Sequence, residues 1–489
     1  MEKLKNYING QWTESNSNEM LEVTNPATAS VINFVPLGCS ADVNDAAAAA
    51  KQAFKDWRNT PITDRIQYLF KMKKILEDNV DEISKICTME SGKTFAESKA
   101  EMKRAVENIE VACGMPQMMQ GDFSEDIANG IDEFMIRQPL GVAACIAPFN
   151  FPIMIPFWFM PYAIASGNCY IIKPSEKVPG TMVKIFELIE KAGLPKGVLN
   201  LVHGGEKTVN TILEHEDIQA ISFVGSTKVA RHIYATGTKF NKRVQAQGGA
   251  KNPVVIMPDA DLETTSEIIV DSVYGCAGQR CLAASNIILV GKDTSKFREA
   301  LVESAKKRVV GYGLESNVQM GPVITNESKE RVYSLIQKAI DEGANLVVDG
   351  RNQTIENYGK GYFIKPTILE NLNLGGEVIK TEIFGPVMSL INMKTLEDAI
   401  DFINKNKYGN AASIFTNNGS WAREFRRDVN AGNIGINIGI AAPMAFFPFS
   451  GWKDSFLGDL HAQSKHAIEF YTQTKVVIER WNKTWSRKF

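Results

Sequence analysis

Phe223-Val224-Gly225-Ser226-Thr227 joins the apolar run at residues 220–224 to a stretch with helical periodicity at residues 228–236. This order predicts a β-strand that ends in a tight turn of small residues at the start of a helix. Further apolar runs lie at residues 141–146, 169–172, 198–202 and 254–257, with helical stretches at 181–192 and 206–215 between them. Strands that alternate with helices predict an α/β fold, in which a parallel sheet has helices on both faces.

A second block of alternating strands and helices is predicted after Cys281. Its apolar runs lie at residues 287–290, 346–348, 387–393, 411–415 and 433–438. Helical periodicity dominates residues 40–120, before the first block. A chain of 489 residues exceeds the size at which a single core keeps growing, so we expect two or three domains. Two α/β blocks favour a site in the cleft between them.

Charge and composition argue against several classes of protein. A net charge of −2 without a long charge run argues against nucleic-acid binding. The most apolar stretch, residues 149–165, contains Pro152, Pro156 and Pro161, which favours a folded core segment over a membrane span. Seven cysteines without a tight pairing pattern suit a reducing compartment, and the N-terminus shows no targeting segment. We therefore expect a cytoplasmic protein with no nucleic-acid or membrane partner.

Two patterns that suggest a bound phosphate or metal are rejected. Ser91-Gly92-Lys93-Thr94 ends like a phosphate-binding loop, but Cys87 stands where that motif needs its first glycine, and no strand precedes it. His461 and His466 do not have the helical i, i+4 spacing of a metal site, and the chain contains no His-Glu-x-x-His. We therefore expect that the protein needs no metal.

The turn at Gly225-Ser226 is a candidate site for a dinucleotide cofactor. The backbone N–H groups of such a turn, together with the N-terminus of the following helix, can bind a pyrophosphate. The chain contains no Gly-x-Gly-x-x-Gly, so the usual dinucleotide fingerprint is absent. The candidate depends on the order of strand, turn and helix.

Five short runs, taken together, resemble the NAD(P)-dependent aldehyde dehydrogenases in residue type, order and spacing. They are Pro148-Phe149-Asn150-Phe151-Pro152, Lys173-Pro174-Ser175-Glu176, Phe223-Val224-Gly225-Ser226-Thr227, Gly278-Gln279-Arg280-Cys281-Leu282 and Glu382-Ile383-Phe384-Gly385-Pro386. The resemblance extends from about Tyr7 to about Tyr471. It implies two Rossmann-like α/β domains and a small β element that pairs with a neighbouring subunit.

The resemblance also implies the limits of these domains. Residues 1–118 and 139–248 would form the NAD-binding domain, and residues 249–440 the catalytic domain. Residues 119–138 and 468–489 would form the oligomerisation element of a homodimer or homotetramer. Within these last ranges, the segments 130–138 and 471–480 mix β-formers with charge and have no obvious place in either sheet.

Two catalytic residues follow from the resemblance. Hydride loss from an aldehyde needs a nucleophile that first converts the carbonyl into a tetrahedral alkoxide, and Cys281 would supply it as a thiolate. Asn150 would donate a hydrogen bond to the alkoxide. By composition alone, a single cysteine is more often a small buried hydrophobe. We interpret the remaining cysteines in that way: Cys39, Cys87, Cys113, Cys145, Cys169 and Cys276.

The resemblance assigns the cofactor residues as well. Besides Gly225 and Ser226, these are Phe149, Lys173, Glu176, Glu382 and Phe384. Lys173 would reach the adenosine ribose, and Glu176 would accept from its hydroxyls and repel a 2′-phosphate, which favours NAD over NADP. Glu382 would hold the nicotinamide ribose, with the ring of Phe384 beside it. Without the resemblance, Lys173 and Glu176 would be interpreted as a solvated loop pair.

Gln247 is a departure from the family pattern. Most aldehyde dehydrogenases carry Glu-Leu-Gly-Gly-Lys where this chain has Gln247-Gly248-Gly249-Ala250-Lys251, and their glutamate activates the water that hydrolyses the thioester. An amide cannot take a proton from water, whereas a thiol with a pKa near ~8.5 is partly ionised at neutral pH. The substitution therefore predicts a thiol acceptor, and we expect coenzyme A.

Several runs resemble the coenzyme-A-acylating methylmalonate-semialdehyde dehydrogenases. They are Gly278 to Cys281, Gly249 to Asn252, Gly193 to Val198, and the block from Ala442 to Lys453. In that subfamily two arginines hold the substrate carboxylate, and Arg104 and Arg280 match them. A guanidinium fork suits a carboxylate. The alternative for Arg104 is a surface ion pair with Glu101 or Glu107.

We therefore expect NAD-dependent, coenzyme-A-acylating oxidation of methylmalonate or malonate semialdehyde. The products would be propionyl-CoA or acetyl-CoA, with loss of CO₂. One alternative is a hydrolytic NAD(P)-dependent dehydrogenase of another anionic aldehyde, with a base supplied from elsewhere. A second alternative is a non-catalytic scaffold that retains the fold.

Overall fold

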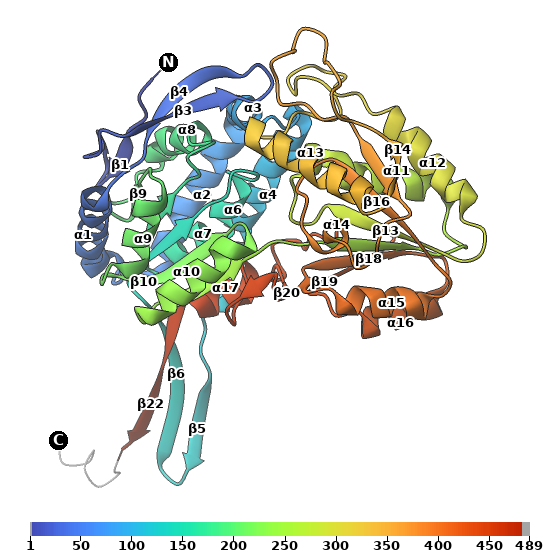
Figure 1. The fold of residues 1–489 in the computed structure, drawn as a ribbon. Coiled ribbons are helices and arrows are strands. Elements are labelled where there is room, and N and C mark those ends of the chain that lie inside the picture. The colour runs from blue at the N-terminus through green and yellow to red at the C-terminus, as the bar shows by residue number, and fades with distance from the viewer. Residues whose placement is uncertain (1, 482–489) are drawn as a thin grey trace, which may run out of the picture.

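The computed structural model describes residues 2–481 and contains two large sheets that lie side by side (Figure 1). The first sheet has eight strands in the order β2-β1-β9-β8-β7-β10-β11-β21. Their bounds are β2 Gln11–Thr13, β1 Asn6–Ile8, β9 Leu199–Leu201, β8 Cys169–Lys173, β7 Val142–Ile146, β10 Ile218–Val224, β11 Arg243–Gln247 and β21 Phe456–Leu457. The strands from β9 to β11 pair in parallel, as the alternating pattern predicts.

The second sheet has seven strands in the order β14-β15-β16-β13-β12-β18-β19. Their bounds are β14 Asn345–Val348, β15 Thr367–Glu370, β16 Val387–Met393, β13 Ala284–Val290, β12 Asn252–Ile256, β18 Ala411–Phe415 and β19 Asn433–Ile436. Only the edge strand β14 pairs antiparallel within this sheet. The α/β fold class predicted from the sequence is confirmed.

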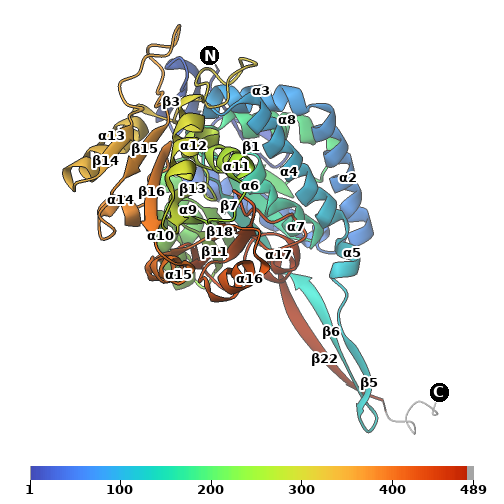
Figure 2. The ribbon, with the colours of Figure 1, turned by 90° about the vertical axis from the view of Figure 1, so that its right-hand side faces the viewer.

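The helices connect and cover these strands (Figures 1 and 2). Their bounds are α1 Ser40–Trp57, α2 Ile62–Asp78, α3 Val80–Ser91, α4 Phe95–Cys113, α5 Met115–Met118, α6 Met154–Phe157, α7 Met160–Ala165, α8 Gly180–Ile189, α9 Glu206–Glu214, α10 Thr227–Lys239, α11 Leu262–Tyr274, α12 Ser295–Lys306, α13 Asn326–Asp341, α14 Glu377–Lys380, α15 Leu396–Lys405, α16 Gly419–Asp428 and α17 Ser464–Tyr471. Helices α1 to α5 account for the periodicity predicted at residues 40–120. In residues 2–481, no helix has the length and apolar character needed to cross a membrane.

The grouping of the strands predicted from the sequence is wrong at one point. The run at residues 254–257 was assigned to the first block, but β12 lies in the second sheet, between β13 and β18. The same apolar pattern fits a strand of either sheet, and only the hydrogen-bond partners of the strand decide to which sheet it belongs. Within the two large sheets, the predicted apolar runs leave out β1, β2, β11, β15 and β21. The sequence of β11, Arg-Val-Gln-Ala-Gln, has no apolar run to mark it, although four of its five residues are buried.

A third sheet of three strands projects from the body (Figures 1 and 2). It has the order β22-β6-β5, with β22 at Thr472–Arg480, β6 at Ile131–Pro139 and β5 at Phe123–Ala128. The prediction that these segments join neither large sheet is therefore confirmed. Residues 482–489 of the predicted oligomerisation element lie outside the described residues.

Tyr471 anchors the base of β22 in the core. Its hydroxyl lies 2.6 Å from Ser222 Oγ and 3.0 Å from the hydroxyl of Tyr170, and both tyrosines are fully buried. We predict that Tyr471→Phe lowers the free energy of unfolding by about 1 to 2 kcal/mol, because the buried hydroxyls of Ser222 and Tyr170 lose a partner. Urea denaturation measures this, and an unchanged midpoint would contradict the prediction.

Candidate active site

The loop after β7 and the loop before β13 meet at Asn150. Asn150 follows the carboxyl end of a parallel strand, where ligand sites of α/β sheets are found. Its Nδ2 donates a 2.9 Å hydrogen bond to the backbone carbonyl of Gln279. The carboxamide has two N–H donors, so one can hold this loop while the second is presented to a ligand. The bond places Asn150 beside the segment that carries Cys281.

Cys281 is held by its backbone and is partly buried. Its carbonyl oxygen accepts 2.8 Å hydrogen bonds from the side-chain amides of Asn252 and Asn410. Burial, and then the charge of Glu382, raise the pKa of the Cys281 thiol to about 12, although the backbone N–H groups of Cys281 and Leu282 partly offset this. The side chain of Cys281 is therefore a thiol at neutral pH.

The backbone before Cys281 is strained. Cys276 and Ala277 have φ values of 50° and 54°, in the left-handed region that non-glycine residues seldom adopt. Glu97 on α4 stabilises this turn, because its Oε1 accepts from the N–H of Cys276 at 2.7 Å and from Arg280 Nη2 at 2.9 Å. Gln279 adds a further tie, since its Oε1 accepts from the N–H of Ile324 at 3.0 Å.

The two predicted substrate arginines both contact α4, and each is paired with a carboxylate. Arg280 forms an ion pair with Glu97 in the first turn of α4. Arg104 pairs with Glu107 at 2.6 Å and also donates to the carbonyl of Pro443. The ion pair with Glu107, the alternative considered for Arg104, is therefore present. Seven residues make nearly two helical turns, so Glu97 and Arg104 lie on one face of α4, about 10 Å apart along its axis.

Lys173 and Glu176 lie at the carboxyl end of β8. Lys173 Nζ donates to Glu176 Oε2 at 3.1 Å and to the carbonyl of Gly204 at 2.7 Å. The solvated loop pair is wrong for Lys173, whose side chain is 4% exposed, against 31% for Glu176. Burial would raise the pKa of Glu176, but the charge of Lys173 and hydrogen bonds outweigh it and lower that pKa. Glu176 is therefore an anion that also faces solvent.

The turn at Gly225-Ser226 has the predicted geometry. Ser226 is exposed and is the N-cap residue of α10. The N–H of Gly225 is not free for a phosphate, because it donates to the carbonyl of Gln247 at 3.0 Å. A Cβ at Gly225 would lie 2.4 Å from the ring of Phe223, so the position requires glycine. The N-terminus of α10 remains as the anion-binding element of this turn.

Glu382 and Phe384 reach the first sheet from the second half of the chain. Glu382 Oε1 accepts from the N–H of Ala250 at 3.0 Å, and a Cβ at Gly249 would lie 2.6 Å from Oε2. Burial raises the pKa of Glu382 to about 7. The rings of Phe149 and Phe384 meet edge to face with centroids 5.8 Å apart. The predicted nicotinamide-side residues are thus brought to the same region as Asn150.

Gln247 at the end of β11 is buried and makes a hydrogen bond. Its Nε2 donates to the carbonyl of Phe449 at 3.4 Å. Phe449 belongs to the block from Ala442 to Lys453, and its ring packs on Trp158 with centroids 4.4 Å apart. An amide suits this position because it can donate to a carbonyl, whereas an ionised carboxylate could not.

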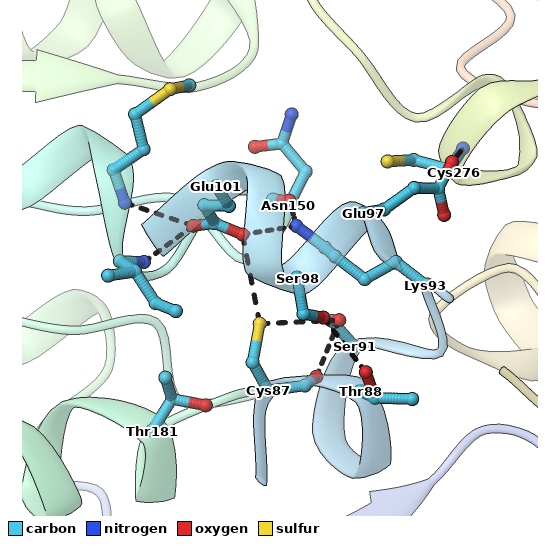
Figure 3. A network of polar contacts seen from close by, with 12 residues as sticks. Cys87, Thr88, Ser91, Lys93, Glu97, Ser98, Glu101, Asn150, Thr181 and Cys276 are labelled. Atoms are coloured by element: carbon cyan, nitrogen blue, oxygen red, sulfur yellow. Dashed lines mark hydrogen bonds and ion pairs between the residues drawn. The ribbon is translucent and has the colours of Figure 1, made fainter. Parts of the chain in front are cut away.

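Sequence reasoning missed the polar network beneath Asn150 (Figure 3). Lys93 belongs to the rejected phosphate-loop pattern, yet its Nζ donates to the backbone carbonyl of Asn150 at 2.6 Å and pairs with Glu101 at 2.5 Å. Glu97 was missed as well. The signal was a lysine just before a helix and two glutamates on it, a charge pattern that by sequence looks like an exposed face.

Metal ligands do not gather in the described part of the chain. Within residues 2–481, no group of three or more His, Cys, Asp and Glu side chains is placed to hold a metal ion.

Comparisons with known proteins agree with this geometry. Residues 12–477 match the model of the aldehyde dehydrogenase family. The chain belongs to the aldehyde dehydrogenase family. It is 46% identical over 481 residues to a malonate-semialdehyde dehydrogenase of Bacillus pumilus, covering 98% of this chain and 99% of the relative.

Two solved structures of related enzymes superpose closely on this fold. One is a methylmalonate-semialdehyde dehydrogenase of Oceanimonas doudoroffii, with 39% identity, a TM-score of 0.98 and complete coverage of both chains. The other, from Sinorhizobium meliloti, is provisionally assigned the same name and was solved with NAD. It has 39% identity and a TM-score of 0.97 over 99% of each chain. The fold class and the family predicted from the sequence are therefore confirmed.

We predict that iodoacetamide alkylates Cys281 of the unliganded protein slowly at pH 7, with a rate that rises roughly tenfold per pH unit up to pH ~9.5. The thiolate is the reactive form, and a thiol pKa of about 12 keeps its fraction rising throughout this range. The mass of the peptide that contains Cys281 reports the reaction, with Cys281→Ala as the control. A plateau below pH ~8.5 would show an ordinary thiol pKa instead.

Proposed function

We propose that this chain oxidises malonate or methylmalonate semialdehyde with NAD and transfers the acyl group to coenzyme A. The observation that carries the proposal is Gln247, which stands where most of the family has a base and donates to the carbonyl of Phe449. A thioester beside it would lack a group that can deprotonate water. The names of the Bacillus, Oceanimonas and Sinorhizobium relatives support the substrate.

The first half of the reaction uses Cys281 and Asn150. The Cys281 thiolate adds to the aldehyde carbon, and the second N–H of Asn150 stabilises the alkoxide that forms. When bound, NAD⁺ accepts the hydride as the alkoxide collapses, which leaves a thioester on Cys281. Burial and the charge of Glu382 raise the pKa of the Cys281 thiol, so a proton has to leave Sγ before or during the addition.

The second half removes the carboxylate and the acyl group. The thioester carbonyl can accept the electron pair of the breaking C–C bond, so the β-carboxylate leaves as CO₂ and an enolate forms. Protonation of the enolate gives the acetyl or propionyl thioester. The thiolate of coenzyme A then attacks the thioester carbonyl and releases Cys281. A thiol needs no strong base for this step, whereas water does.

We assign the substrate carboxylate to Arg104, which lies on α4, and Arg280, which pairs with Glu97 of the same helix. Glu97 and Glu107 already hold these guanidinium groups in place. Each guanidinium has five N–H donors, so a carboxylate that bridges the two can bind donors that the glutamates leave unused. The paired glutamates reduce the net positive charge around the two arginines, which favours an aldehyde with a single carboxylate over one with a more highly charged phosphate.

The remaining assignments are also proposals. Glu176 supports NAD over NADP, since a 2′-phosphate would meet an anion held by Lys173. We keep residues 1–118 with 139–248 as the NAD-binding domain and residues 249–440 as the catalytic domain. The three-stranded sheet supports a homodimer or homotetramer, because Phe123, Val476 and Ile478 expose more than 60% of their surface. A cytoplasmic location stays a prediction.

The requirement for coenzyme A tests the proposed function. We predict that malonate semialdehyde and NAD give a burst of at most one NADH per active site, followed by a slow steady rate. Coenzyme A should raise the steady rate strongly, with acetyl-CoA as the product identified by mass. Brisk release of a free acid without coenzyme A would instead support a hydrolytic dehydrogenase of another anionic aldehyde.

A substitution at Gln247 extends this test. Gln247→Glu is expected to raise the coenzyme-A-independent rate, but by less than the ~10²-fold of a well-placed base. The reason is that the carboxylate would face the carbonyl of Phe449, which disfavours its ionised form. Gln247→Met removes the amide without adding a base and serves as the control.

The arginines have their own prediction. Arg104→Leu and Arg280→Leu should each raise KM for malonate semialdehyde at least ~10-fold more than KM for propanal, which has no carboxylate. Steady-state kinetics with both aldehydes measures this difference. An equal loss for the two aldehydes would show that the arginines are structural and would remove the substrate assignment.

A further inference from the structure

A buried ion pair lies directly beneath Asn150 (Figure 3). Lys93 Nζ and Glu101 Oε2 are 2.5 Å apart, and their side chains are 2% and 0% exposed. Burial would lower the pKa of Lys93, but the charge of Glu101 raises it above its usual value, so Lys93 is a cation at neutral pH. Of the predicted catalytic residues, the pair hydrogen-bonds to Asn150, through its backbone carbonyl.

Most of the hydrogen bonds of this pair, apart from the one within it, go to the segment 150–154. Lys93 Nζ donates to the backbone carbonyl of Asn150 at 2.6 Å and lies 4.2 Å from the centre of the Phe151 ring. Glu101 Oε1 accepts from the N–H groups of Ile153 at 2.7 Å and Met154 at 3.0 Å. The cation therefore holds the start of the segment 150–154, and the anion holds its end.

Stability alone does not account for such a pair. Removing two charges from water costs about as much as their attraction returns, and apolar replacements of buried pairs are often neutral or stabilising. What the pair supplies is position, because each of its hydrogen bonds has a specific direction. The segment it holds has no regular structure before α6, so these contacts largely determine where its backbone lies.

The same stretch of chain is also fixed to the other half of the site. The N–H of Phe95 donates to the carbonyl of Gly313 at 2.8 Å. A Cβ at Gly321 would lie 1.7 Å from the carbonyl oxygen of Gly92, so the two backbones are in direct contact. Two residues after Phe95, in the same first turn of α4, Glu97 holds the strained turn before Cys281. Lys93 and Glu101 thus set Asn150 relative to the nucleophile.

We propose that Lys93 and Glu101 are positioning residues that orient the carboxamide of Asn150 toward the alkoxide. The inference rests on the proposed role of Asn150 as oxyanion donor. Lys93 does not touch the reacting atoms. It fixes the peptide group of Asn150, and a displacement of about 1 Å at a donor can cost roughly 100-fold in rate. The pair therefore acts on the rate of the chemical step through one residue.

The test is a mutant cycle on the NADH burst. Lys93→Met/Glu101→Gln removes both charges with little change in volume and avoids an uncompensated buried charge. The burst rate with malonate semialdehyde should fall about 10- to 100-fold, while the Kd for NAD and the alkylation rate of Cys281 stay unchanged. Lys99→Met is the matched control, because Lys99 lies on the same helix but pairs with Asp81 at the surface.

Asn150→Ala separates positioning from general damage. It should lower the burst rate by ~10²- to 10³-fold. In this background, Lys93→Met/Glu101→Gln should have no further effect, since the group that the pair positions is gone. If the neutral pair does not fold, Lys93→Arg takes its place, because it keeps the cation but changes the geometry of the donor. Its effect on the burst rate is then measured with and without Asn150→Ala.

Three outcomes overturn a specific part of the argument. The positioning role is overturned if the substitutions at Lys93 and Glu101 lower the burst rate of Asn150→Ala by the same factor as that of the unmodified protein. It is also overturned if a folded variant of Lys93 has an unchanged burst rate. In both cases the function of Asn150 stands. A normal burst in Asn150→Ala alone overturns the proposed oxyanion donor itself. The two failures are therefore distinguishable in one set of measurements.

Discussion

The active site depends on the partly buried carboxylate of Glu97, which joins its two halves. Glu97 lies in the first turn of α4. Its carboxylate accepts hydrogen bonds from the N–H of Cys276 and from the side chain of Arg280, and both residues lie shortly before β13 of the second sheet. A turn with two consecutive left-handed residues is costly, and an acceptor at its strained N–H group offsets part of that cost. The nucleophile is thereby fixed relative to the helix that also supports Asn150 and Arg104.

Burial shifts the pKa values of two ionisable groups at the site. The pKa of the Cys281 thiol is raised and the nearby Glu382 has a pKa of about 7, so neither group is fully ionised at neutral pH. Gln247, whose amide donates to the carbonyl of Phe449, offers no base that could take a proton from water.

Helix α4 has more than one role in this molecule. Its N-terminal turns contact the strained turn, the Asn150 loop and the segment around Gly313, and its next turn carries Arg104. Charged residues on one helix usually indicate a solvated face. Here α4 packs against α2, α3, α6 and α7, and Lys93 just before it and Glu101 on it are buried. Structural and catalytic demands are therefore concentrated on the residues from Lys93 to Arg104.

The sequence by itself determined the fold class, the family and the residue types of the chemistry. Alternating apolar runs predicted most of the parallel strands of both sheets, and the order of motifs predicted the roles of Cys281, Asn150 and Glu382, because short-range patterns record local structure and residue types. Tertiary structure alone decided that β12 belongs to the second sheet, that Lys93 supports Asn150, and that Arg280 is paired with Glu97. Asn150 and Gln279 are 129 residues apart in the chain, and no local pattern reports a hydrogen bond over such a separation. The burial and the partners of a charged group depend on how elements that are far apart in the chain pack together. A short sequence pattern carries no information on that packing.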